Sequence, residues 1–350
     1  MAALRRRRLG SHGPEVTELG FGAAAVGNLY RPVSDAEARS VLDAAYAHGV
    51  RYFDTAPHYG FGLSERRVGD GLRAHPRAEF VVSTKVGRLL APLADGAGSA
   101  ERHGFHSALP FEPVFDYSYR GVMRSFEDSL QRLGLARIDV LLIHDIGKAT
   151  HGDANTELFR LCMEGGYRAL DELRAQGRVG AIGLGVNEYE VCQDAMQWGR
   201  FDCFLLAGRY TLLEQQPLDT FMPACSSHGA TVIIGGAYNS GILATGTRGP
   251  GPRYFNYAPA PDAIVERVAR IESVCDEFGV TLAAAALQFP LAHPLVASVI
   301  PGVATVQQFE QTMRVFNEII PEAFWHTLKA RGLLRTDTPT PDSGAPRPGR

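Results

Sequence analysis

Residues 138–145 have the sequence Ile138-Asp-Val-Leu-Leu-Ile-His-Asp145. Four consecutive apolar residues, 140–143, fill the middle of this stretch, which is typical of a parallel β-strand covered on both faces. A side chain capable of proton transfer, His144, follows at once. The stretch therefore predicts a buried parallel strand that carries a functional residue at its carboxyl end.

Similar runs recur along the chain and alternate with helical patterns. Ser34 and Glu37 have the spacing of a capping box that opens one helix, and Val122, Phe126 and Leu130 form the apolar stripe of another. Eight strands alternating with helices favour a (β/α)8 TIM barrel of the α/β class, and we expect one such domain over residues 1–335. The expected strands cover residues 17–21, 50–53, 80–84, 138–143, 179–184, 203–206, 231–234 and 296–300.

Three segments depart from this alternation. Residues 88–117 contain Gly, Pro and His with little periodicity, and a long loop inside a compact domain is typical of a functional lid. Residues 235–259 are similarly rich in Gly and Pro. Residues 336–350 contain Pro, Gly, Ser and Thr without a large apolar residue, so we expect a disordered C-terminal tail.

The composition of the chain indicates which kinds of molecule it could bind. Basic and acidic residues nearly cancel (35 − 38 = −3), so no broad positive field is available for nucleic acid or an anionic membrane, and a small-molecule substrate is expected. No apolar run approaches the ~20 residues of a membrane span, and Arg5 to Arg8 precede no secretory apolar segment, so we expect a cytoplasmic protein. The five cysteines are odd in number and never spaced as C-x-x-C, which favours reduced thiols without a metal. Nothing in the composition indicates the oligomeric state.

A loose dinucleotide fingerprint stands at Gly20-Phe-Gly22-Ala-Ala-Ala25. A Rossmann turn must open directly into a helix, whereas the Ser34 cap delays the helix here by about ten residues, and no acidic strand end follows. We therefore interpret Gly22 as part of a tight turn after the first strand.

Polar side chains follow three of the expected strands. Asp54, Lys85 and His144 come directly after residues 50–53, 80–84 and 138–143, and Tyr59 lies five residues beyond Asp54. Taken singly, these could be a helix cap, a solvated lysine, a satisfied histidine and a packed ring. Because the carboxyl ends of barrel strands meet at one face, we expect the four side chains to form one active site.

The stretches Asp54-Thr-Ala-Pro-His-Tyr-Gly60, Ser83-Thr-Lys-Val86 and Leu141-Leu-Ile-His-Asp145 resemble motifs of the aldo-keto reductase superfamily. The resemblance covers about residues 5–330. It implies a barrel that binds a nicotinamide dinucleotide and moves a hydride to or from a carbonyl or alcohol carbon. It also implies a catalytic tetrad of Asp54, Tyr59, Lys85 and His144.

The expected chemistry of this tetrad centres on Tyr59. A free phenol has a pKa of ~10, and an adjacent ammonium should lower it, by about two units for roughly 3 kcal/mol of differential stabilisation. Asp54 would keep Lys85 charged and in place, and His144 would orient the reacting oxygen.

The resemblance extends to cofactor contacts. It places the nicotinamide carboxamide at Asn187, with a helix N-cap as the alternative role, and the pyrophosphate at residues 239–243 and the helix start at Thr305. Glycine occupies the position of the usual stacking aromatic, so Tyr210 or Tyr238 is expected to stack instead. Gly302 and Gln308 stand where NADP-preferring relatives carry cations, which favours NAD over NADP, although Arg314 lies nearby. The expected cofactor-binding residues are Gly22, Asn187, Tyr210, Asn239, Ser240, Gly241, Leu243, Gly302, Thr305 and Gln308.

Residues 144–146, 185–188 and 205–214 resemble the branch of the family that contains D-threo-aldose, L-fucose and D-arabinose dehydrogenases. His58, Asp145 and Arg209 are the expected substrate contacts, and His58 or Arg209 could alternatively be a solvated or capping group. We expect oxidation of the anomeric C1 of an aldose to the aldonolactone, with Tyr59 as general base. The alternatives are an NADPH-dependent carbonyl or aldehyde reductase, a pyridoxal 4-dehydrogenase, and a cofactor-sensing regulatory subunit with little catalysis.

Overall fold

The computed structural model describes residues 3–94, 101–249 and 251–341. Its centre is a parallel sheet with the order β16-β13-β12-β11-β10-β5-β4-β3. Bridges from Leu19 to Val299 and from Gly22 to Gly302 join the two edge strands, so the sheet closes into the expected single-domain (β/α)8 barrel. The barrel strands are β3 Phe21–Gly22, β4 Tyr52–Asp54, β5 Val81–Val86, β10 Val140–His144, β11 Ala181–Val186, β12 Cys203–Ala207, β13 Thr231–Gly235 and β16 Val296–Ile300.

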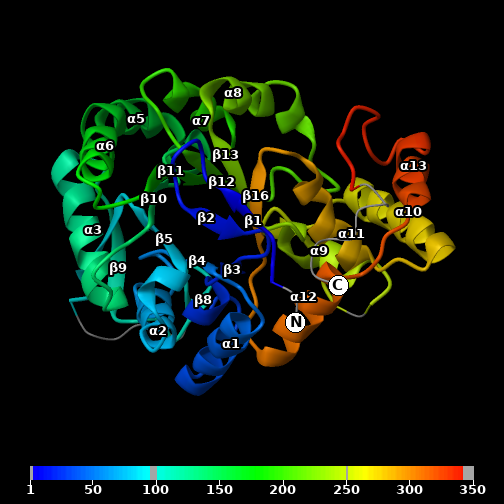
Figure 1. Cartoon of the computed structure of the whole chain (residues 1–350), viewed down its shortest axis with the longest axis horizontal. Helices are drawn as coiled ribbons and strands as arrows, with labels where there is room; N and C mark the ends of the chain where they lie inside the picture. The colour runs from blue at the N-terminus through cyan, green and yellow to red at the C-terminus, as the bar shows by residue number, and fades with distance from the viewer. Residues whose placement is uncertain (1–2, 95–100, 250, 342–350) are drawn as a thin grey trace.

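Helices surround these strands (Figure 1). The Ser34 capping box is present at the start of the first helix, where the Ser34 side chain accepts a hydrogen bond from the Glu37 amide. The α10 and α13 helices lie together on one side of the barrel (Figure 1). The α-helices are α1 Asp35–Ala47, α2 Leu63–Leu72, α3 Tyr119–Leu133, α4 Lys148–His151, α5 Asn155–Leu161, α6 Arg168–Ala175, α7 Glu190–Met196, α8 Phe221–His228, α9 Ile242–Thr245, α10 Asp262–Phe278, α11 Leu282–Gln288, α12 Val306–Phe316 and α13 Glu322–Ala330.

The first expected strand, 17–21, is wrong in its first half. Thr17 belongs instead to β2 (Glu15–Thr17), which pairs antiparallel with β1 (Arg6–Arg8). Leu9 and Val16 of this hairpin are buried with Val140 and Leu142 in the barrel interior. The hairpin therefore closes one end of the barrel, and only the short β3 joins the parallel sheet.

Alternation along the strands decides which side chains face the barrel axis. Val140 and Leu142 of β10 belong to the interior cluster, whereas Leu141 and Ile143 belong to the larger core between strands and helices. Most strands also end one or two residues later than expected, so His144 is the last residue of its strand rather than the first of a loop. Two-residue alternation therefore places polar side chains on the axis at the carboxyl end.

The described parts of the segment 88–117, which leave out residues 95–100, form two hairpins within the expected lid. The strands β6 (Arg88–Pro92) and β9 (Phe111–Phe115) pair antiparallel, as do β7 (Glu101–Arg102) and β8 (Phe105–His106). The tip of the second hairpin is held to the barrel, because the Tyr30 amide donates to the Gly104 carbonyl at 2.9 Å. A third hairpin, β14 (Tyr254–Phe255) with β15 (Ala258–Pro259), lies in the Gly/Pro-rich segment 235–259.

The start of the expected disordered tail is wrong. Thr338 is only 1% exposed, and Arg335 pairs with Asp219 at 2.6 Å and with Asp337 at 2.8 Å, so the first residues of the expected tail are ordered against the rest of the domain. Residues 342–350 of that tail lie outside the described residues.

All five cysteines are buried and unpaired. Within the described ranges no single helix is long and apolar enough to cross a bilayer, and one pair that passes on length and composition together, α10 with residues 282–292, is bent by 103°.

Candidate active site

Three of the four expected catalytic side chains meet on the barrel axis. The Lys85 ammonium donates to Asp54 Oδ2 at 2.7 Å, to the Thr55 carbonyl at 2.9 Å and to the Tyr59 hydroxyl at 3.1 Å. Asp54 and Lys85 are each 1% exposed. The other carboxylate oxygen of Asp54 accepts from the Ser83 hydroxyl at 2.6 Å, so the whole group is fixed by β4 and β5.

His144 lies beside this group at the end of β10. Its ring centre is 5.9 Å from that of Tyr59, in an edge-on arrangement. Burial, with Arg88 and Lys85 nearby, holds the pKa of His144 well below its usual range. A neutral imidazole can donate or accept a single hydrogen bond to a reacting oxygen without adding a charge.

The expectation that Lys85 lowers the pKa of Tyr59 is wrong as a net effect. Burial raises the pKa of the phenol above its ordinary value, and the ammonium of Lys85 only partly opposes this because the carboxylate of Asp54 lies close behind it. Burial also acts to lower the pKa of Lys85, but Asp54 and Tyr59 raise it above its ordinary value. The site therefore holds a protonated tyrosine beside a persistent ammonium.

The loop that carries Tyr59 is fixed by a close backbone crossing. Gly60 has φ +64°, and a Cβ there would lie 2.4 Å from the Gly27 carbonyl oxygen. Gly27 closes the turn 25–27 after β3, and a Cβ on it would lie 2.9 Å from the Tyr59 backbone. The two glycines let the turn pack against the Tyr59 backbone, which sets the height of the phenol above Lys85.

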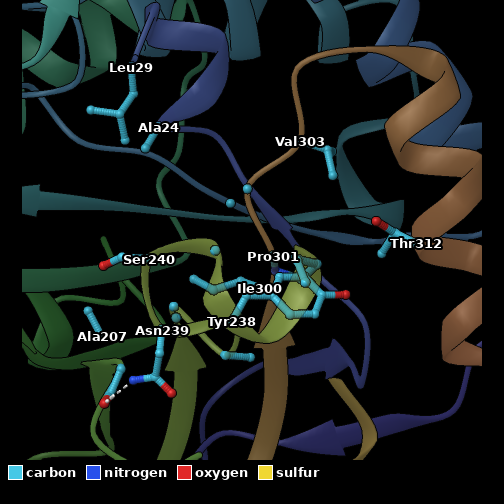
Figure 2. A pocket seen from close by; sticks show the side chains of 18 of the residues that line it. Ala24, Leu29, Ala207, Tyr238, Asn239, Ser240, Ile300, Pro301, Val303 and Thr312 are labelled. Atoms are coloured by element: carbon cyan, nitrogen blue, oxygen red, sulfur yellow. Dashed lines mark hydrogen bonds between the residues drawn. The ribbon is translucent and has the colours of Figure 1, made fainter. Parts of the chain in front are cut away.

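A cavity of about 710 Å³ opens at the carboxyl ends of the strands on one side of Tyr59. Its lining comes from β3, the ends of β12, β13 and β16, and the helices η6 (Asn239–Gly241) and α12. Figure 2 shows Tyr238, Asn239 and Ser240 from the segment after β13 among the lining residues, with Ile300 at the end of β16 and Pro301 and Val303 after it. We call it the long cavity.

A second cavity of about 440 Å³ lies on the other side of Tyr59. Lys85, His144, Asp145 and Asn187 line it, together with His58 and the lid residues His103 and Phe105. We call it the reaction cavity. Tyr30, Tyr59 and Tyr257 line both cavities, so the two spaces meet at the candidate base.

Residues 18–331 match the model of the Aldo/keto reductase family. The chain belongs to this family. Family membership makes it an oxidoreductase that uses a nicotinamide dinucleotide.

Two curated relatives are similar over nearly the whole chain. Pyridoxal 4-dehydrogenase of Microbacterium luteolum is 47% identical over 95% of this chain and 99% of its own length. D-threo-aldose 1-dehydrogenase of a Pseudomonas species is 39% identical over 93% of this chain and 96% of its own. The solved glycerol dehydrogenase of Gluconobacter oxydans shares the fold, with a TM-score of 0.72 at 21% identity, covering 99% of both chains.

Six of the expected cofactor contacts of this aldo/keto reductase line the long cavity: Gly22, Asn239, Ser240, Gly241, Gly302 and Gln308. Asn239 and Ser240 have φ of 44° and 60°, and successive left-handed residues can aim backbone amides at an anion. A Cβ on Gly241 would meet no atom within 4 Å, so a side chain there would occupy open space. The bare backbone, the size of the cavity and the start of α12 at its edge fit a dinucleotide.

The remaining expected cofactor contacts lie elsewhere. Tyr210 is fully buried against the rings of Phe289 and His293, so it cannot stack on a nicotinamide, whereas Tyr238 lines the long cavity. The apolar side chain of Leu243 is buried in the core. The Thr305 hydroxyl accepts from the Gln308 amide at 3.1 Å and thus caps α12.

Asn187 lines the reaction cavity, not the long cavity, within the described residues. The alternative that Asn187 caps the next helix is wrong, because the N-cap residue of α7 is Tyr189.

Of the expected substrate contacts, His58 and Asp145 line the reaction cavity, but Arg209 lines neither cavity in the part of the chain that the structure describes. Arg209 is held by Glu214 at 3.3 Å, by Asn256 at 3.1 Å and by the Asn187 carbonyl. Burial lowers the pKa of His58 to about 3, so its ring is neutral.

Three functional neighbours were not expected from the sequence. Arg88 pairs with Asp145, Tyr117 donates to the His144 carbonyl at 2.8 Å, and Tyr257 donates to Asn187 Oδ1 at 3.1 Å. Arg88 and Tyr117 lie in the segment 88–117, which was expected to be a lid, and Tyr257 lies in the Gly/Pro-rich segment 235–259. No pattern within either segment singled out these three residues.

Proposed function

We propose that this aldo/keto reductase is an NAD-dependent dehydrogenase that oxidises the cyclic hemiacetal of a pyridoxal-like aromatic aldehyde to a lactone. The observation that carries the proposal is the 47% identity, over nearly the full length of both chains, to a protein named pyridoxal 4-dehydrogenase. Pyridoxal has an aldehyde next to a hydroxymethyl group on its ring, so it can close to a hemiacetal whose carbinol carbon is oxidised like C1 of an aldose.

The lining of the reaction cavity supports a flat aromatic substrate. The ring of Phe105 lies 6.2 Å from Tyr59 and 5.4 Å from His58, and His58 lies 6.0 Å from His144. Aromatic surfaces favour planar rings that can stack or meet them edge-on. The hydrogen-bonding groups that would suit a polyhydroxylated sugar are fewer than the sequence suggested, because Arg209 is held away by Glu214 and Asn256.

The reaction follows from the positions of Tyr59 and its neighbours. Tyr59, as phenolate stabilised by the Lys85 ammonium, would take the hydroxyl proton of the hemiacetal while the C–O bond becomes C=O. The hydrogen on that carbon leaves with its electron pair, and the nicotinamide ring supplies the acceptor for this hydride. His144 would hold the reacting oxygen, and the lid residues Phe105 and His103 would exclude water from it.

The long cavity would hold most of the dinucleotide, with Asn239, Ser240 and Gly241 near the pyrophosphate, and the nicotinamide end would extend into the reaction cavity, where Asn187 would contact the carboxamide. We propose NAD over NADP because neutral Gln307, Gln308 and Gln311 line the cavity beside α12. Among the described residues that line the long cavity Arg314 is the one cation, and its guanidinium donates to Gln311 Oε1 at 3.0 Å.

An aldose dehydrogenase is the second candidate. It is favoured by the 39% identity to D-threo-aldose 1-dehydrogenase and by Asp145, a carboxylate that lines the reaction cavity. Both candidates oxidise a cyclic hemiacetal with the same four residues, so the difference lies in the cavity wall and not in the proton chemistry.

The test measures the appearance of reduced nicotinamide with pyridoxal, L-fucose, D-arabinose or a simple aliphatic alcohol, each with NAD+ and NADP+. We expect the highest kcat/KM with pyridoxal and NAD+. A higher kcat/KM with a sugar would establish the second candidate. Cofactor binding without turnover of any substrate would instead favour a regulatory subunit that senses the cofactor.

A lid variant separates the two substrates. Phe105→Leu keeps an apolar side chain but removes the ring, and we expect kcat/KM for pyridoxal to fall about tenfold, the upper range of one aromatic contact, while that for sugars stays within about twofold. Trp198→Leu, which removes an exposed ring that lines neither cavity of the described structure, is the matched control and should change neither kcat/KM.

A further inference from the structure

We propose that Asp145 is a positioning residue that acts on the cofactor through Asn187, by fixing which way the Asn187 amide points. The inference rests on the proposed function, since it concerns the carboxamide of a bound nicotinamide. It replaces the expectation that Asp145 recognises the substrate directly.

Both oxygens of the Asp145 carboxylate already accept hydrogen bonds from protein groups. Oδ2 accepts from Arg88, which follows the last residues of β5, and Oδ1 accepts from Asn187 Nδ2 at 3.2 Å. The side chains of Arg88 and Asp145 are 10% and 12% exposed. A buried carboxylate with both oxygens engaged is well suited to hold a neighbour in one orientation.

The chemistry of this contact fixes the amide. An ionised carboxylate can only accept hydrogen bonds, so Asn187 must turn its NH2 group toward Asp145 and its oxygen away. The oxygen in fact accepts from the Tyr257 hydroxyl at 3.1 Å, and Tyr257 lines both cavities. Asp145 therefore makes Asn187 present an acceptor on the side where the long cavity and the reaction cavity meet.

The backbone holds Asp145 in place independently of its carboxylate. Its φ is 48°, a left-handed conformation that Asp and Asn adopt more readily than other side chains. Its amide donates to the Gly185 carbonyl at 3.0 Å, and Tyr117 donates to its carbonyl at 3.3 Å. Asparagine has the same shape and tolerates this conformation, so Asp145→Asn keeps the shape of the side chain while it removes the negative charge that pairs with Arg88 and replaces one acceptor oxygen by an NH2 donor.

The substitution should reverse the Asn187 amide. Arg88 has only donors to offer, so the new amide would give its oxygen to Arg88 and turn its NH2 group toward Asn187. The Asn187 oxygen would then accept from this NH2 group, so Asn187 would present its own NH2 group to the cofactor. In the wild type the NH2 group of the nicotinamide carboxamide would donate to the Asn187 oxygen. In the variant the same NH2 group would face the NH2 group of Asn187, and two donors cannot form a hydrogen bond.

The experiment measures equilibrium binding of two dinucleotides by titration of the protein's own fluorescence. One is NAD+, and the other is acetylpyridine adenine dinucleotide, in which a methyl group replaces the carboxamide NH2. We expect the wild type to bind the analogue about tenfold more weakly, the typical effect of one hydrogen bond. In Asp145→Asn the ratio of the two Kd values should fall to about one.

Three variants serve as controls. Asp43→Asn removes the same charge from an exposed site on α1 and should keep the wild-type ratio. Tyr257→Phe, at an exposed residue, removes the hydroxyl that donates to the Asn187 oxygen and should also keep the ratio, because Asp145 still orients the amide. Asn187→Ala should bring the ratio to about one even if Asp145→Asn fails to fold.

The outcomes separate the two proposals. A wild type that binds neither dinucleotide overturns the proposed function itself. A wild-type ratio near one, or an Asn187→Ala variant that keeps the full ratio, overturns the inference and leaves the proposed function standing. Asp145→Asn with the full ratio and a raised KM for the substrate would make Asp145 a substrate contact, which also overturns the inference.

Discussion

The ammonium of Lys85 lies 3.1 Å from the hydroxyl of Tyr59 and 2.7 Å from the carboxylate of Asp54. One buried cation therefore serves two partners of different character: a carboxylate that it neutralises permanently and a phenol whose ionised form it can stabilise. This division explains why the group is stable with Tyr59 protonated, whereas the phenolate that forms at higher pH is stabilised by the same ammonium and can accept a proton from substrate.

Replacing Lys85 by Met should nearly abolish turnover. The phenolate of Tyr59 loses the charge that stabilises it, and the loss of general base catalysis corresponds to a fall in kcat of about 10²- to 10⁴-fold. Stopped-time assays of reduced nicotinamide formation measure this. Titration with NAD+ should show that the cofactor still binds, since Lys85 does not line the long cavity of the described structure.

The same variant should also be less stable, which provides a control. Asp54 is left buried without its counter-charge, a situation that costs about 3–5 kcal/mol. The double variant Asp54→Asn with Lys85→Met removes that charge and should recover most of the free energy of unfolding, measured in urea. Activity should not return. A double variant that regains activity would contradict the assignment of Lys85.

The pH profile of oxidation should rise toward alkaline pH without a histidine step. Because burial holds the pKa of Tyr59 above its ordinary value, the phenolate fraction grows tenfold per pH unit, and kcat/KM should increase with a slope of roughly one between about pH 7 and about pH 9. His58, with a pKa of about 3, and His144 remain neutral over this range. A plateau that begins near neutrality would contradict this assignment.

Cofactor preference should respond to one added charge. Gln307 is exposed and lines the long cavity, so Gln307→Arg places a guanidinium where a 2′-phosphate would come close. One charge-assisted hydrogen bond contributes about 1.5–3 kcal/mol, so kcat/KM with NADP+ should rise at least about tenfold relative to NAD+. Gln197→Arg, equally exposed after α7, should leave the ratio unchanged.

Acid should destabilise the protein in part through His58. The unfolded histidine binds a proton below about pH 6.5, whereas the folded one does so only near pH 3. Between these values the unfolded state holds more protons, so stability falls as pH falls, by up to ~1.4 kcal/mol per pH unit for this one group.

Urea unfolding at pH values near neutrality and near 5 checks this. His58→Gln should lose less stability than the wild type over that interval, whereas His326→Gln, on the exposed face of α13, should behave like the wild type. Equal losses in all three proteins would show that His58 titrates normally.

Runs of apolar residues in the sequence correctly predicted the barrel strands whose residues are all buried. The run 140–143 became the middle of β10, and the expected strand 296–300 has the bounds of β16. The prediction failed at 17–21 because Thr17 pairs with Arg6 in the hairpin that closes the barrel, a contact no local pattern encodes. Thr338 is buried for a similar reason, since Asp219 holds the neighbouring Arg335.

Sequence patterns predicted the polar side chains of the site that lie at the ends of strands, but not those that lie in loops. Asp54, Lys85 and His144 were found because parallel strands end on one face. The sequence did not predict Arg88, Tyr117 and Tyr257, because they lie in segments after the barrel strands where no periodic pattern indicates which side chains face the site. Tyr210 and Arg209 were assigned wrongly because a residue's spacing does not show whether its side chain turns to the core, to a neighbouring acid or to the cavity.

The sequence by itself determined the barrel, the identity of its polar strand ends and the family to which the chain belongs, because strand alternation and residue type are local properties. Only the tertiary structure decided the net direction in which the pKa of Tyr59 moves, since burial and the opposing charges of Asp54 and Lys85 depend on distances across β4, β5 and the Gly60 turn. It also decided that Asp145 faces Arg88 and Asn187, because hydrogen-bond partners from three different loops are fixed by packing and not by their order in the chain.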